Sequence, residues 1–239
     1  AQDTSRFGID RVGHSQLPEL LERASEIPGV EWLRALYCYP ERVDERLLDT
    51  MKRLPNVCDY LDLPMQHISQ HILTDMNRTD TSAHIREVCR MFKERGMMLR
   101  TTLMVGFPGE TEDEAMDTVS LVEEVGFDAL FTFIYSPREG TPAAKMEDVL
   151  TKEEKSANFQ RLLARQNAIS AEKHAAYVGK TLRVLVDGRN DDGKHTLTAR
   201  TDGGRLVHLD GGEELIGGFY SCRITGSSNW ALFGEIVEA

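Results

Sequence analysis

Between residues 28 and 142, apolar runs typical of β-strands alternate with charged segments whose apolar residues recur at helical spacing. The predicted strands lie in "VEWLRALYCYP", "DYLDLPMQHIS", "MLRTTLMVGFPGE" and "FDALFTFIYSPREGT". The predicted helices lie in "ERVDERLLDTMKRL", "SQHILTDMNR", "TSAHIREVCRMFKERG" and "TEDEAMDTVSLVEEVG". Strands that alternate with helices predict βαβ units and a parallel sheet, either open or closed toward a barrel.

The residues at the ends of these strands favour the barrel. Each strand finishes in turn-forming or reactive side chains: Cys38 to Pro40, Gln66 with His67, Gly106 to Glu110, and Ser136 to Thr141. In a β/α barrel the carboxyl ends of all strands converge on one mouth, where active sites form. Because only four or five strands are present, we predict a partial barrel over residues 1–150 and not a closed eight-stranded one.

The pattern changes twice after this region. Thr151 and Glu154 form a capping signal for one long helix that ends at Gly179, and residues 151–178 are predicted to connect two domains. Residues 179–239 contain about five short alternating strands separated by Gly, Asp and Asn, which is typical of a small barrel of the OB type. The predicted fold class is α/β, with a partial barrel followed by a small all-β barrel.

The turn "LMVGFPGET" has two interpretations. Gly106 and Gly109 give a tight turn between strand and helix the backbone freedom it needs, and Thr111 with Glu114 forms a capping box for a helix that ends before Gly126. Alternatively, the two glycines let a ligand approach the backbone while Glu110 faces the mouth. No Gly-Lys-Ser/Thr follows, so a P-loop is excluded.

Charge, cysteine spacing and hydropathy argue against several classes of protein. The formal net charge of −11 argues against a protein that coats nucleic acid, and residues 179–239 hold seven Lys and Arg against nine Asp and Glu. The four cysteines form no C-x-x-C pair, so neither a disulfide framework nor a zinc site is indicated. No apolar run is long enough to span a bilayer and no signal-like segment opens the chain, which predicts a cytoplasmic location and no membrane partner.

Hydrolase motifs are also absent, which suggests that a cofactor performs the chemistry. Gln66 beside His67 suits recognition of a polar cofactor, because the amide both donates and accepts hydrogen bonds. Arg100 opens its strand and reads as a surface arginine. Arg138, on the loop after the last strand, is either a solvated turn residue or a clamp for substrate or cofactor.

Six blocks resemble, in order and at comparable spacing, the radical S-adenosylmethionine methylthiotransferases. They are "AQDTSRFG", "LRALYCYPERV", "YLDLPMQHIS", "MNRTDTS", "TTLMVGFPGETEDE" and "FTFIYSPREGTPAAKM". The terminal barrel resembles the TRAM domain of the same enzymes. The resemblance covers essentially the whole chain.

This resemblance implies a six-stranded partial barrel, S-adenosylmethionine as a cofactor, and two [4Fe-4S] clusters in the full enzyme. The family holds its radical cluster on a C-x-x-x-C-x-x-C motif, which does not occur in this chain. We therefore expect the chain to be the C-terminal part of a longer enzyme and to be unable to perform the radical step alone. The opening octapeptide is expected to be the carboxyl end of an interior barrel strand.

Two branches of the family remain open as the substrate class. "AQDT", "LYCYP" and "DLPMQHIS" resemble the branch that modifies the β-carbon of an aspartate in small-subunit ribosomal protein twelve, whereas "RLVHLDG" and "NWALFGEIVE" resemble the branch that modifies tRNA beside the anticodon. The acidic small barrel favours the basic ribosomal protein as partner and leaves tRNA second. A non-catalytic module that binds RNA or protein is the alternative class.

The motifs also imply site residues. They carry cofactor contact to Gln2, Asp3, Gln66, His67, Arg100 and Glu110. Arg138 is the expected contact for substrate. No residue of this chain is expected to bind a metal.

Overall fold

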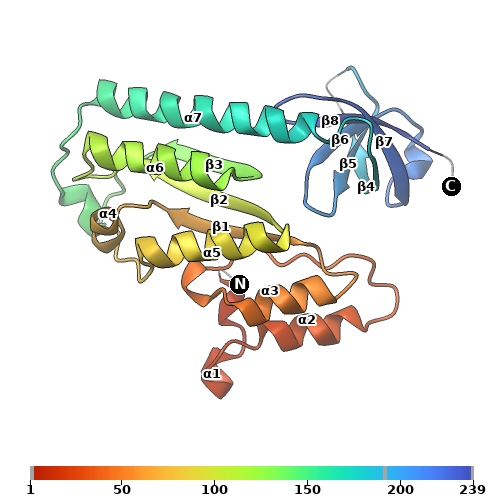
Figure 1. The fold of residues 1–239 in the computed structure, drawn as a ribbon, viewed down its shortest axis with the longest axis horizontal. Helices are drawn as coiled ribbons and strands as arrows, with labels where there is room; N and C mark the ends of the chain where they lie inside the picture. The colour runs from red at the N-terminus through yellow and green to blue at the C-terminus, as the bar shows by residue number, and fades with distance from the viewer. Residues whose placement is uncertain (1–2, 191–192, 238–239) are drawn as a thin grey trace. The chain divides into compact units, whose positions relative to one another are not determined.

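The computed structural model describes residues 3–190 and 193–237. The chain divides into two compact units between Gln166 and Asn167. This division falls inside α7 (Lys152–Ala175), the long helix that Thr151 and Glu154 cap as predicted (Figure 1). The domain limits proposed from the sequence, at residues 150 and 178, stay predictions.

The first unit contains a three-stranded parallel sheet. Its strands are β1 (Tyr60–Gln66), β2 (Met98–Val105) and β3 (Ala129–Ile134), arranged in chain order. Both pairings are parallel, with Asp62 opposite Arg100 and Thr102 opposite Phe131. The predicted βαβ organisation is confirmed in these three strands.

Helices form in each segment that was predicted to be helical. They are α3 (Glu45–Arg53), α4 (Gln70–Asp75), α5 (Ser82–Arg95) and α6 (Glu112–Val125), and they follow α1 (Ile9–Val12) and α2 (Leu17–Ser25). The capping box of Thr111 and Glu114 is present at the start of α6, and Gly126 ends that helix with φ 62°. Short 3-10 turns complete the set: η1 (Thr4–Arg6), η2 (Pro40–Arg42), η3 (Pro142–Lys145) and η4 (Glu213–Leu215).

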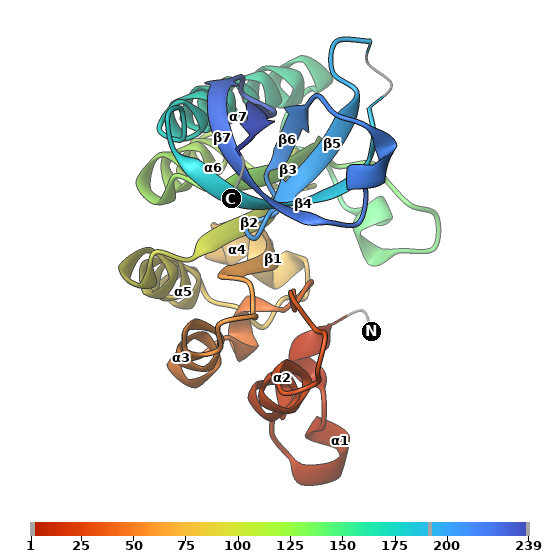
Figure 2. The same cartoon turned by 90° about the vertical axis from the view of Figure 1, so that its right-hand side faces the viewer.

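The core of the first unit lies between the sheet and its helices. Alternate residues of β1 and β2, including Leu61, Leu63, Leu103 and Val105, are completely buried, and both views show α5 and α6 on one side of the sheet (Figures 1 and 2). Each such side chain contributes about 1.5–3 kcal/mol by leaving water. This burial fixes which face of each strand turns away from the helices.

The expectation of a strand in residues 30–40 was wrong. The Cys38 N–H donates to the Asp62 carbonyl, and Leu33 forms an isolated parallel bridge with Val57, so the segment runs beside β1 without a continuous ladder. Tyr37 has φ 62°, a left-handed conformation that breaks the extended run. Parallel pairing needs regular hydrogen bonds along both strands, and this turn prevents them.

The opening octapeptide also differs from its prediction. Residues 1–2 lie outside the described part, and Thr4–Arg6 form η1 instead of the end of a strand. The Thr4 N–H donates to the Tyr37 carbonyl, so this turn lies beside the 33–38 segment.

The second unit holds a closed five-stranded barrel, as predicted. Its strands are β4 (Thr181–Arg189), β5 (Leu197–Thr201), β6 (Leu206–Leu209), β7 (Phe219–Ser227) and β8 (Leu232–Ile236), all labelled in Figure 1. They are hydrogen-bonded in the order β4-β5-β6-β8-β7. Nine buried residues, among them Val184, Val207 and Ile224, fill its interior. Across the described ranges of both units, no helix is long and apolar enough to cross a bilayer.

Candidate functional site

The sheet of the first unit exposes side chains on the face opposite its helices. Because side chains alternate along a strand, this face carries the residues between the buried ones. We call it the open face and define it by Asp62, Arg100, Thr102, Met104, Phe131 and Phe133. The two phenylalanines are 54% and 42% exposed, far more than side chains of a packed core. The open face is therefore the surface of the sheet that is available to a ligand.

A charged pair crosses the first two strands of the open face. Arg100 Nε lies 3.6 Å from Asp62 Oδ2, and the Arg100 guanidinium lies 3.8 Å from the centre of the Phe131 ring. Burial raises the pKa of the Asp62 carboxyl, while the positive charge of Arg100 opposes that rise. Arg100 is thus positioned by a carboxylate and an aromatic ring, and is not the simple surface arginine that the sequence suggested.

Gln66 ends β1 in a strained conformation. It has φ 70°, and Tyr37, which precedes the Cys38 that donates to the Asp62 carbonyl of β1, has φ 62°. Non-glycine residues in this region cost about 1–3 kcal/mol each, and they concentrate at functional sites. Gln66 is partly exposed and Tyr37 is 41% exposed, so both side chains remain accessible.

His67 and Glu110 form a fully buried pair. His67 Nε2 lies 2.8 Å from Glu110 Oε1, and neither side chain is exposed. The Ser69 N–H donates to His67 Nδ1 at 3.0 Å, so the ring proton is on Nε2 and is donated to Glu110. The other carboxylate oxygen accepts the Gly106 N–H. The pair ties the end of β1 to the turn after β2, and Glu110 is enclosed instead of facing an open mouth.

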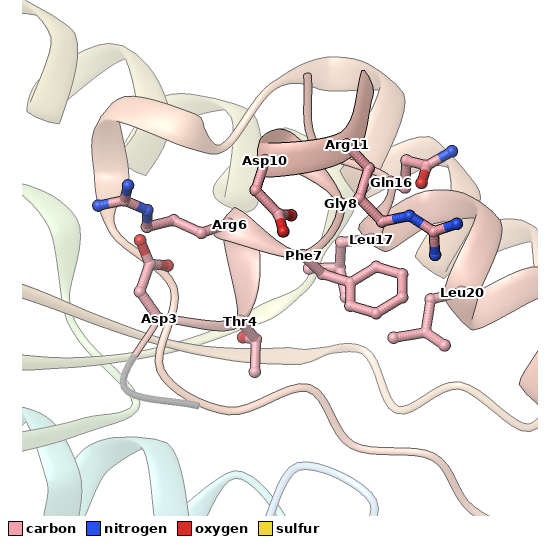
Figure 3. A pocket seen from close by; sticks show the side chains of 10 residues that line it. All are labelled: Asp3, Thr4, Arg6, Phe7, Gly8, Asp10, Arg11, Gln16, Leu17 and Leu20. Atoms are coloured by element: carbon pink, nitrogen blue, oxygen red, sulfur yellow. The ribbon is translucent and has the colours of Figure 1, made fainter. Parts of the chain in front are cut away.

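The Asp3 carboxylate also binds other residues of the first unit. Its carboxylate accepts the Ser5 N–H at 3.1 Å and the Ser5 hydroxyl, and it lies 3.3 Å from Arg42. It lines one end of a half-open, mainly apolar groove of about 520 Å³, in which the Phe7 ring points toward Leu20 (Figure 3). The rest of the lining comes from η1, α1 and α2: Thr4, Arg6, Gly8, Asp10, Arg11, Gln16 and Leu17.

The structure does not bring the other two predicted site residues, Arg138 and Gln2, together with the residues described above. Arg138 lies exposed on the loop after β3, where its carbonyl accepts hydrogen bonds from Thr141. Gln2 lies outside the described residues. Cofactor contact by His67, Glu110 and Asp3 stays a prediction, as does substrate contact by Arg138.

The described residues do not assemble a metal site. No group of three or more His, Cys, Asp or Glu in ranges 3–190 and 193–237 is placed to hold an ion. The cysteines are all buried, and burial raises the pKa of Cys38 to about 11, of Cys89 to about 12 and of Cys222 to about 11. These thiols stay protonated, whereas clusters are held by thiolates.

Asp62, Phe131 and Phe133 were not predicted as site residues. Their signal was the period-two pattern of the strands: a charge inside each of "YLDLPMQ" and "MLRTTLMV", and aromatic residues at alternate positions of "ALFTFI". A charge inside an apolar strand indicates a face that the core does not cover.

Comparison with known proteins gives two matching family models. The radical SAM superfamily matches residues 7–122, and the TRAM domain matches residues 175–237. Among solved structures, the chain is similar to coproporphyrinogen III oxidase (HemN) from Escherichia coli, a radical SAM enzyme. The two align with a TM-score of 0.51 and 18% identity, over 67% of this chain and 37% of that enzyme. This likeness supports the fold alone.

Curated relatives match over the full length of the chain. The ribosomal protein uS12 methylthiotransferase RimO of Desulfitobacterium hafniense is 38% identical, covering 100% of this chain and 55% of the relative. The enzyme of the same name from Bacteroides fragilis is 39% identical, covering 99% and 56%. The chain thus spans just over half the length of these relatives. It contains a radical SAM region followed by a TRAM domain, and over its whole length it is similar to part of these methylthiotransferases.

Proposed function

We propose that the chain is part of a radical SAM enzyme that adds a methylthio group to the β-carbon of an aspartate in ribosomal protein uS12. The relatives that match the full length of the chain carry ribosomal protein uS12 in their names, and the aspartate is our proposal. The observation on which the proposal of a cofactor site mainly depends is the open face, where Arg100 contacts both Asp62 and Phe131 and where Phe133 is also exposed.

The open face fits S-adenosylmethionine in its chemistry. That cofactor has a charged amino-acid end, a sulfonium and a flat adenine, and the open face has Arg100 and Asp62 for charged groups and Phe131 and Phe133 for an apolar ring. The Gln66 amide adds both a donor and an acceptor. When bound, S-adenosylmethionine supplies the radical precursor and the methyl group. The residues of this chain bind and orient it.

The described residues do not fit an iron–sulfur cluster, because their thiols are separate and buried, and burial raises the pKa of Cys38, Cys89 and Cys222. We therefore expect the cluster ligands of the full enzyme to come from outside the described ranges, and this chain alone to be inactive in the radical step.

The charge of the chain favours a protein substrate over tRNA. The small barrel has two more acidic than basic residues and the whole chain has a net charge of −11. Binding to a phosphate backbone needs an excess of Lys and Arg, whereas ribosomal proteins are basic. tRNA remains the second candidate because the TRAM domain belongs to a class of small barrels that bind RNA. Both partners place the enzyme in the cytoplasm.

Equilibrium dialysis of the chain against S-adenosylmethionine tests the cofactor site. The proposal predicts saturable binding that Arg100→Gln weakens at least about tenfold, since a charge-assisted contact contributes about 1.5–3 kcal/mol. Arg86→Gln is the matched control, because Arg86 pairs with Glu124 on the helical side of the sheet. Equal binding by both variants, each confirmed as folded by circular dichroism, would remove the open face as the cofactor site.

A further inference from the structure

Three aromatic side chains meet on the outer surface of the small barrel. The ring centres of His195, His208 and Phe233 lie 6.1, 5.5 and 5.9 Å apart, and their planes differ by only 23–30°. All three are partly exposed. We call them the three-ring patch.

The three rings cannot form a face-to-face column. In a column of three, the outer two centres would be about twice as far apart as neighbours, whereas here the three separations are nearly equal. The rings therefore lie partly side by side and together present a broad π surface. His208 and Phe233 are register partners on the paired strands β6 and β8, so the closed barrel holds their positions.

One carboxylate contacts this patch directly, and a second is linked to it through a neighbouring strand. Asp210 is 68% exposed at its side chain and lies 3.4 Å from His195 Nδ1. Thr198, the register partner of His208, donates its hydroxyl to Asp187, and that same carboxylate holds Arg200 at 3.0 Å. Arg200, two residues along β5 from Thr198, is thus already paired with a carboxylate. Aromatic faces beside carboxylates attract a planar cation, while a nucleic-acid surface would need basic side chains that are not paired with carboxylates.

We propose that the three-ring patch binds an arginine side chain of a basic protein segment. The guanidinium stacks on the rings, and Asp210 accepts its hydrogen bonds. The net acidic charge of the barrel complements such a segment. Identifying the segment as part of uS12 rests on the proposed function, whereas the recognition of arginine does not.

The first test uses the whole chain and small probes. Proton NMR signals of His195, His208 and Phe233 are followed at mildly alkaline pH during titration with N-acetyl-arginine amide, N-acetyl-lysine amide and adenosine monophosphate. The proposal predicts shifts at these rings that are larger with the arginine probe than with the lysine probe. Shifts with the nucleotide alone would overturn it and indicate a base-stacking site.

The second test measures the affinity of the whole chain for purified uS12. Phe233→Leu is expected to weaken binding about tenfold, because it removes the ring but keeps an apolar side chain. Phe219→Leu, on β7 and outside the patch, is the matched control. If the unaltered chain binds uS12 and Phe233→Leu binds equally well, the patch is not the site of recognition. If the unaltered chain does not bind uS12 but the arginine probe shifts the rings, the inference stands and the proposed substrate fails.

Discussion

Replacing Glu110 with alanine is expected to destabilise the first unit by about 3 kcal/mol, because the carboxylate serves two buried donors. His67 Nε2 donates to one oxygen and the Gly106 N–H to the other. The substitution leaves both donors without their acceptor at a site where neither side chain of the pair is exposed.

The magnitude follows from these contacts. Each buried donor that loses its acceptor costs about 1–3 kcal/mol. Two lost acceptors would cost about 2–6 kcal/mol in total. Thr118 Oγ1 lies 3.3 Å from the same His67 nitrogen and recovers part of the loss, so the expected value of about 3 kcal/mol lies in the lower half of that range. Glu110→Gln is expected to cost less, about 1–2 kcal/mol, because the amide oxygen still serves one donor while its NH₂ group faces the other.

Urea unfolding of a Trp230→Phe background measures this change. Of the two tryptophans, Trp32 lies in the first unit and Trp230 in the second, so the remaining fluorescence reports on the first unit alone. Glu123→Gln is the control, because its partner Arg165 is exposed and surface pairs contribute less than about 1 kcal/mol. A loss below about 1 kcal/mol for Glu110→Ala would refute the buried pair as the link between β1 and the turn after β2.

Two other predictions concern pH and association. Burial alone would raise the pKa of Glu114, but hydrogen bonds from Ser69, Thr111 and His71 lower it from 4.5 to about 2. Its stabilising effect is therefore complete above pH 4.5 and disappears as pH falls toward 2. Thermal unfolding should show Glu114→Gln less stable than the parent at neutral pH and converging with it in acid, and a constant difference would contradict this. The exposed Phe131 and Phe133 are expected to promote self-association. Sedimentation should show fewer oligomers when both are changed to serine, and a parent chain that is monomeric throughout would oppose the prediction.

The sequence predicted the elements whose signals are local. Thr111 and Glu114 are three residues apart and by themselves predict the start of a helix. The short alternating strands separated by glycines predicted the small barrel. The prediction of a strand at residues 30–40 was wrong, because an apolar pattern does not indicate the left-handed conformation of Tyr37. Nor does it indicate how few backbone hydrogen bonds join this segment to β1.

The contacts of the candidate site are long-range, and the sequence could not supply them. His67 and Glu110 are 43 residues apart and meet only because β1 and β2 are adjacent in the sheet. Arg100 looked like a surface residue from its place at the start of a strand, but the register sets it opposite Asp62. The order of the motifs indicated the family, whereas the pairing of the strands determines which residues lie on the open face.

The proposed activity is tested most directly by mass spectrometry of uS12 and tRNA from cells in which the gene for this chain has been deleted. If the chain acts on uS12, then uS12 from these cells loses a methylthio group from one aspartate, a plasmid-borne copy of the gene restores it, and methylthio-adenosine in tRNA is unchanged. Unmodified tRNA together with normally methylthiolated uS12 would contradict the proposed activity and assign the chain to the tRNA branch.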